Sequence, residues 1–158
     1  MKKTKPRFTG IQLASIVFIL CIVGDFASTL AVGKPLIELL ETNPIFHWLG
    51  LWGLLVLNFG VAALFYYGYQ YVEKVNIRYA ILLTMCIIVF LRFFIIINNL
   101  SVAAHPPTIE QAKSISSAVK TSYVLSSVVW PFILAYIPSV MAFGLFWKDH
   151  KIRRVKNG

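Results

Sequence analysis

Asp25 and Arg92 are the two ionisable residues that lie well inside long apolar stretches of this chain. A lone charge near the centre of a bilayer costs at least about 2.5–3.5 kcal/mol, so each of these side chains needs a partner. Counting about 1.5 Å per helical residue from the ends of their stretches places the two within roughly 5 Å of the same depth. We therefore expect an ion pair between Asp25 and Arg92, made directly or through water.

Further polar residues surround this expected pair. Ser28 and Thr29 follow Asp25 by three and four positions, so all three share one face of a helix. Asn99 follows Arg92 by seven positions and so shares its helix face, and Asn58 lies somewhat deeper in another apolar stretch. The expected buried polar group consists of Asp25, Arg92, Ser28, Thr29, Asn58 and Asn99.

A second polar set is expected at the outer mouth of the apolar stretches, and it consists of Glu41, Asn43, His47 and His105. Carboxylate and imidazole groups suit zinc, copper or iron, so Asp25, Glu41, His47 and His105 are candidate metal ligands. No H-x-x-x-H or E-x-x-H spacing supports a metal site. We therefore commit to no metal, and predict no cofactor and no catalytic residue.

Three interpretations of these polar residues remain open. A metal or a carboxylate pair could activate water in a hydrolase, although the chain has no G-x-S-x-G element and no paired intramembrane aspartates. Asp25 could carry a proton in a transporter, although the inner halves of the stretches offer few polar steps. The interpretation that we favour is a hydrogen-bonded lock that holds helices together.

Four apolar stretches of about twenty residues must position these groups, and roughly 20 helical residues cross a bilayer core of about 30 Å. The chain is 58% hydrophobic over its 158 residues. Because every backbone group in lipid must be paired, the sequence predicts an all-α, four-transmembrane-helix bundle that forms a single domain over 1–158. The expected spans are 11–32, 46–72, 79–97 and 124–147, with external segments 33–45 and 98–123.

The net charge of +9 is concentrated on one side of the expected spans. Eleven lysines and arginines precede the first span, follow the fourth, or lie between the second and third. The positive-inside rule then places both termini in the cytoplasm of a cell whose plasma membrane holds the chain. The basic tail 148–156 is expected to attract anionic lipid, at about 1 kcal/mol per cation. No nucleic-acid-binding fold accompanies it, so we expect no nucleic-acid partner.

A short signature runs from the end of the first span to the start of the second. It comprises Asp-Phe-Ala-Ser-Thr at 25–29, Gly33, and Glu-Thr-Asn-Pro at 41–44. This D-x-x-[ST]-T, G, E-x-N-P pattern resembles that of an uncharacterised family of small polytopic membrane proteins, to which no activity is assigned. The resemblance implies that Asp25, Thr29, Glu41, Asn43 and Pro44 form one structural or functional unit.

These features together favour association over catalysis. Parts of the chain outside lipid are small, no complete catalytic set is present, and aromatic and glycine-rich faces suit contacts between helices. We expect an accessory or assembly subunit of a larger membrane complex, for example an oxidoreductase or monooxygenase, with other membrane subunits or a second copy as partner. The alternative is a membrane-embedded enzyme or an ion or proton transporter with a polar, metal-binding site near the outer face.

Overall fold

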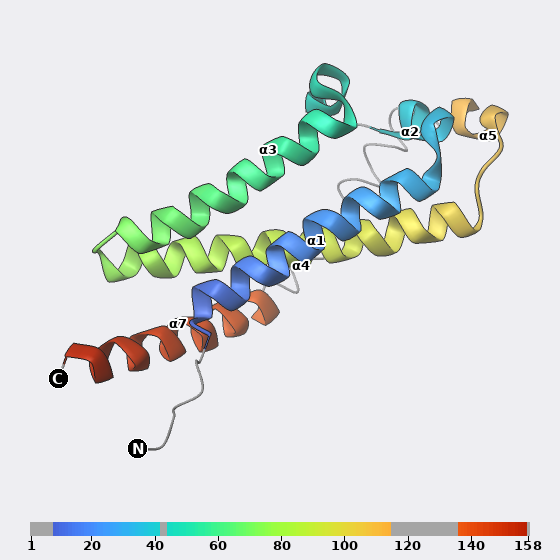
Figure 1. The fold of residues 1–158 in the computed structure, drawn as a ribbon. Coiled ribbons are helices and arrows are strands. Elements are labelled where there is room, and N and C mark those ends of the chain that lie inside the picture. Colours follow the sequence, from blue (N-terminus) through green and yellow to red (C-terminus); the bar gives the residue numbers. More distant parts are fainter. Residues whose placement is uncertain (1–7, 42–43, 115–135, 158) are drawn as a thin grey trace, which may run out of the picture.

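The computed structural model describes residues 8–41, 44–114 and 136–157, and every element in this part of the chain is a helix (Figure 1). The prediction of an all-α protein is therefore confirmed for the described residues. The helices are α1 (Gly10–Val32), α2 (Lys34–Leu40), α3 (Pro44–Tyr71), α4 (Val75–Ala104), α5 (Ile109–Ser114) and α7 (Tyr136–Asn157).

Three of these helices are long and apolar enough to cross a membrane: α1, the Ile45–Tyr71 part of α3, and α4. They correspond to the first three expected spans. Much of the fourth expected span lies outside the described residues, and its remaining part begins α7 at Tyr136. α4 runs past the expected end at 97 to Ala104, so Asn98 and Asn99, which were expected in the external segment, lie inside the helix.

α1 begins at a capping box. The Thr9 hydroxyl accepts from the Gln12 backbone N–H at 3.3 Å, and the Gln12 side chain accepts from the Thr9 N–H at 2.9 Å. This exchange satisfies two of the backbone donors that a helix start leaves unpaired. The helix ends at Gly33, whose φ of 90° favours a residue without a Cβ, and α2 follows directly.

A kink at Gly50 divides α3, and it was not expected from the sequence. Gly50 has φ 64° and ψ −179°, a conformation in the region where glycine is favoured. The short piece before it, Pro44–Leu49, therefore takes a different direction from the longer piece (Figure 1). Trp48 in the short piece is 88% exposed.

α1 lies along α4 and also packs on α3, while α7 packs on α4 and α1 (Figure 1). The buried core is apolar and includes Phe18 and Ile22 of α1 with Leu82 and Met85 of α4. At the end of the bundle where α1 finishes, α2 packs on α5, and each buries one side chain, Ile37 and Ala112. The core thus holds α1 and α4 side by side, which places their polar residues within reach of each other.

Candidate functional site

The site centres on the guanidinium of Arg92, which joins three helices. Its Nη1 donates to Asp25 Oδ2 of α1 at 2.5 Å, and its Nη2 donates to Asn58 Oδ1 of α3 at 2.5 Å. The side chains of Arg92 and Asp25 are 13% and 20% exposed. The ion pair expected from their matching depths is present, and it extends to the asparagine on α3.

An apolar wall borders this ion pair. The Phe18 ring lies 5.9 Å from the Arg92 guanidinium carbon, a distance typical of a cation–π contact. The Arg92 Nε is buried and has no hydrogen-bond partner among the described residues. In such weakly polar surroundings a hydrogen bond is stronger than in water, and an unpaired charge is costlier.

A second layer of hydrogen bonds lies nearer the end of α1. The Asn99 side-chain amide of α4 donates to the hydroxyls of Thr29 at 3.0 Å and Ser28 at 3.3 Å. Both hydroxyls in turn donate to the Asp25 backbone carbonyl, at 2.8 and 2.9 Å. The two layers together form the Arg92 network, which contains Asp25, Ser28, Thr29, Asn58, Arg92 and Asn99.

The outer polar set is only partly brought together. The His47 Nε2 lies 3.3 Å from the Glu41 backbone oxygen, whereas the His105 backbone N–H bonds to Ser101 at the end of α4. Asn43 lies outside the described residues. In the described ranges no three His, Cys, Asp or Glu side chains are grouped to hold a metal. The four candidate ligands come from separate places: Asp25 lies in α1, Glu41 follows α2, His47 lies in the kinked start of α3, and His105 follows α4. Their role as metal ligands stays a prediction.

Sequence reasoning missed the role of Asp149, which is only 4% exposed. Its Oδ1 accepts from the Gly10 backbone N–H, and its Oδ2 accepts from the Ile11 N–H at 3.2 Å and from the Tyr69 hydroxyl at 2.8 Å. A carboxylate at the amino end of a helix satisfies free N–H groups and matches the positive end of the helix dipole. We call this arrangement the Asp149 cap.

The Asp149 cap corrects two expectations. The tail 148–156 was assigned as a whole to lipid, but its one carboxylate binds inside the protein. Tyr66, Tyr67, Tyr69 and Tyr71 near the end of α3 predict an aromatic belt at the headgroups. Tyr69 is instead 1% exposed, and the Arg78 guanidinium lies 5.9 Å from its ring. A lone acidic residue within a basic tail was the available signal, since such a residue needs a reason to be there.

A close helix crossing accompanies the cap. At Gly10 an added Cβ would overlap the backbone oxygen of Leu145 in α7. Glycine is therefore required where α7 passes α1, since any side chain would push the helices apart and lengthen the bonds to Asp149.

Both polar arrangements consist of side chains that hold helices to one another. The Arg92 network joins α1, α3 and α4, and the Asp149 cap joins α1, α3 and α7. Such bonds fix the register and orientation of helices in a membrane bundle.

No protein-family model, curated protein or solved structure matches the chain significantly. The resemblance carried by residues 25–44 accordingly stays a prediction.

Proposed function

We propose that the protein is a four-transmembrane-helix subunit of the plasma membrane with both termini in the cytoplasm. We further propose that it acts as an accessory or assembly subunit of a larger membrane complex, for example an oxidoreductase or monooxygenase. The observation that carries the proposal is that the intramembrane polar side chains form bonds between helices. Arg92 of α4 binds both Asp25 of α1 and Asn58 of α3, so the role of these side chains is to hold the helices of the bundle together.

The ends of the helices support the fourth crossing. Three successive crossings, by α1, α3 and α4, bring the chain to the end of the bundle opposite Gly10, where α5 packs on α2. Asp149 binds Gly10, so by this residue the chain has returned to the end where α1 begins. A fourth crossing between Ser114 and Asp149 makes this return. The basic residues gathered at the same end favour its placement in the cytoplasm.

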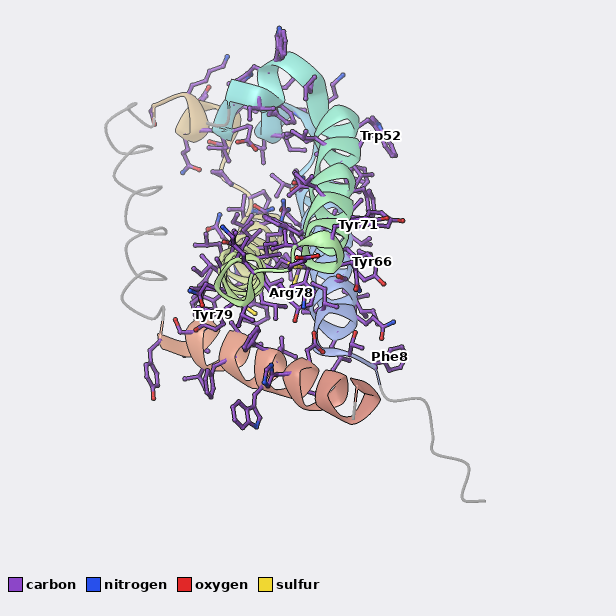
Figure 2. The ribbon with its side chains drawn as sticks, turned by 90° about the vertical axis from the view of Figure 1, so that its left-hand side faces the viewer. Phe8, Trp52, Tyr66, Tyr71, Arg78 and Tyr79 are labelled. Atoms are coloured by element: carbon purple, nitrogen blue, oxygen red, sulfur yellow. The ribbon has the colours of Figure 1, made fainter. Side chains whose placement is uncertain are left out.

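α3 provides the surface that we propose for the partner. Its outward residues are spaced by three or four positions and form one stripe, the outer ridge of α3, with Trp52 visible on the outer side of the helix (Figure 2). The members of this exposed ridge are Trp52, Val56, Gly60, Leu64, Tyr67 and Tyr71.

Gly60 lies in the middle of the outer ridge, and no other segment among the described residues comes within 4 Å of the position that a Cβ would take. Val56 and Leu64 flank it at four positions on either side, so the ridge is notched at its centre. A small residue between larger ones lets a second membrane helix approach closely. We propose that this notch binds a transmembrane helix of another subunit. A second copy of this chain is the alternative partner.

The test is purification of the tagged full chain from its native membrane in mild detergent, with quantification of co-purifying membrane proteins. Gly60→Leu fills the notch and should reduce the recovered partner at least about tenfold, which corresponds to about 1.4 kcal/mol of binding. Ala80→Leu is the matched control, because it also enlarges a small exposed helical residue, but on α4 and not on the outer ridge. Recovery of a single set of partners with the wild type and the control, but not with Gly60→Leu, would support the proposal.

Two results would overturn the proposal. One is a wild-type chain that leaves the membrane as a monomer without stoichiometric partners. The other is unchanged partner recovery with Gly60→Leu, which would separate the association from the outer ridge. A particle that contains two copies and is lost with Gly60→Leu would assign the notch to self-association.

A further inference from the structure

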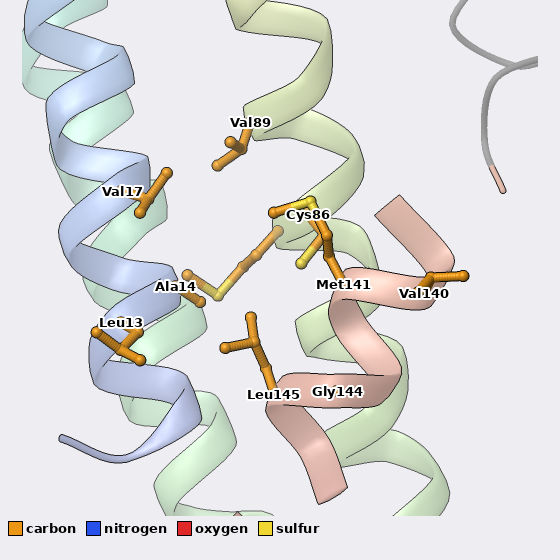
Figure 3. A pocket seen from close by; sticks show the side chains of 10 residues that line it. Leu13, Ala14, Val17, Cys86, Val89, Val140, Met141, Gly144 and Leu145 are labelled. Carbon is orange, nitrogen blue, oxygen red and sulfur yellow. The ribbon is translucent and has the colours of Figure 1, made fainter. Parts of the chain in front are cut away.

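A cavity of about 330 Å³ lies between α1, α4 and α7, about one helical turn from the Asp149 cap. Figure 3 shows Leu13 and Leu145 at one end of it and Val17 and Val89 at the other. Its volume is within the range of pockets that hold small ligands, and about twice that of an engineered cavity that holds benzene. The cavity is also open on one side, so a ligand can enter from the surroundings.

The crossing of α7 over α1 explains why this space exists. The two helices touch where Gly10 meets the backbone of Leu145. One residue before this contact, Gly144 lines the cavity, and among the described residues no other part of the chain comes within 4 Å of the position that its Cβ would take. The absent side chain at Gly144 therefore leaves room that a larger residue would occupy.

The lining of the cavity restricts what it can bind. It consists of aliphatic side chains, two methionines, Gly144 and the thiol of Cys86. A polar ligand needs well-placed donors and acceptors, and this lining offers only a thiol, a weak donor. A flexible hydrocarbon chain needs none, because it gains dispersion contacts along its whole length. Methionines adapt to such a chain because their side chains are unbranched and polarizable.

Charge at one end of the cavity identifies the class of lipid. Met141, Gly144 and Leu145 line the cavity, and Lys148 follows at the next position on the same face of α7. Lys148 thus stands beyond the Leu145 end of the cavity, toward the end of the bundle that carries the Asp149 cap. A phosphate there would lie at the level of the headgroups while its acyl chain ran toward Val17.

We propose that the cavity holds one acyl chain of an anionic phospholipid whose phosphate binds Lys148. This lipid is a fixed constituent of the α1–α7 crossing, in contrast to the exchanging lipid around the rest of the bundle. The inference requires that the helices lie in a bilayer. It does not depend on the accessory role, because it is tested on the purified chain alone.

The experiment reconstitutes the full chain into phosphatidylcholine vesicles that contain phosphatidylglycerol with a photoreactive diazirine on its acyl chain. Illumination, digestion and mass spectrometry then map the labelled residues. We expect labels on cavity residues such as Val17, Cys86 and Met141. Gly144→Leu should lower cavity labelling at least about fivefold, while Gly60→Leu on the outer ridge should leave it unchanged.

A second filling variant protects this test against a folding defect at Gly144. Val17→Phe adds bulk from the α1 wall, and it should lower cavity labelling in the same direction. Size-exclusion profiles and melting temperatures in detergent identify any variant that has lost the fold. The proposal is overturned if a folded filling variant keeps wild-type cavity labelling, or if labels are no denser in the cavity than on α3.

The headgroup is tested by placing the same diazirine chain on phosphatidylcholine. We expect the phosphatidylglycerol probe to label the cavity about fivefold more than the phosphatidylcholine probe, the factor that one lysine near anionic lipid supplies. Lys148→Gln should abolish this preference, while Lys74→Gln, an exposed lysine at the same end of the bundle, should keep it. Equal labelling by the two probes, or a preference that survives Lys148→Gln, would overturn the assignment to anionic lipid.

Discussion

The guanidinium of Arg92 donates to the carboxylate of Asp25 at 2.5 Å, and this bond ties α4 to α1 between residues 67 positions apart. Both side chains are largely buried, so water cannot fully replace the partner if either charge loses it. The pair therefore stabilises one arrangement of the two helices against others that would separate the charges.

We expect Asp25→Asn to lower the free energy of unfolding by about 3 kcal/mol, the lower end of what removal of one partner of a buried ion pair costs. The lower end applies because the Asp25 side chain is 20% exposed. Arg92→Gln should cost a similar amount, and the double variant should recover at least about 1 kcal/mol. The measurement is denaturant unfolding in detergent micelles. Strictly additive losses would show that the two side chains do not act as a pair.

Asn99→Leu should have a smaller effect, because its bonds to Ser28 and Thr29 are between neutral groups. Such bonds in membrane bundles average about 0.6 kcal/mol, so we expect a loss of less than about 1.5 kcal/mol in the same assay. Asn76→Leu is the control, since Asn76 also lies in α4 and is exposed. A loss at Asn99 equal to that of Asp25→Asn would contradict the ranking of the two layers.

Asp149→Ala should destabilise the protein by about 1–2 kcal/mol, because the first turn of α1 loses its acceptor. Tyr69→Phe removes one bond to the same carboxylate and should cost about 1 kcal/mol. The two changes should be less than additive, which a double-mutant cycle measures. Glu73→Ala, an exposed carboxylate at the same end of the bundle, should change little. If Glu73→Ala and Asp149→Ala behaved alike, the cap would have no energetic role.

Gly10→Ala should destabilise the protein by about 1–3 kcal/mol, because the new methyl group overlaps the Leu145 backbone oxygen. Gly60→Ala adds the same group where space is open, and a helical glycine replaced by alanine should gain up to about 1 kcal/mol. Melting temperatures of the two variants should therefore move in opposite directions. A melting temperature for Gly10→Ala at or above the wild-type value would mean that α7 does not cross α1 at this distance.

Cysteine labelling in intact cells tests the orientation. In a Cys21→Ala, Cys86→Ala background, a membrane-impermeant maleimide should react with Glu110→Cys and not with Glu73→Cys. Glu110 and Glu73 are both exposed and lie near opposite ends of α4, so accessibility within the protein does not separate them. Permeabilised cells, in which both sites should react, provide the control. Labelling of Glu73→Cys alone in intact cells would reverse the proposed topology.

The ion pair could be anticipated because it depends on constant features of helices. A fixed rise per residue gives the depth of Asp25 and Arg92 from the ends of their apolar stretches, and a charge in lipid needs a partner. The same regularity placed Ser28 and Thr29 on the face of Asp25. Length and hydropathy likewise indicated three of the helices, because lipid demands long, fully hydrogen-bonded segments.

Other features could not be anticipated because they depend on how helices cross. Gly50 kinks α3 through a φ of 64°, which glycine permits but does not require. Asp149 reaches Gly10 across 139 positions of the chain only because α7 packs on α1 and α4 at one particular angle. The sequence alone therefore determined which polar groups must be paired within lipid. The tertiary structure decided how Asp149 is used, because the contacts of a side chain follow from the relative placement of whole helices, which no local pattern encodes.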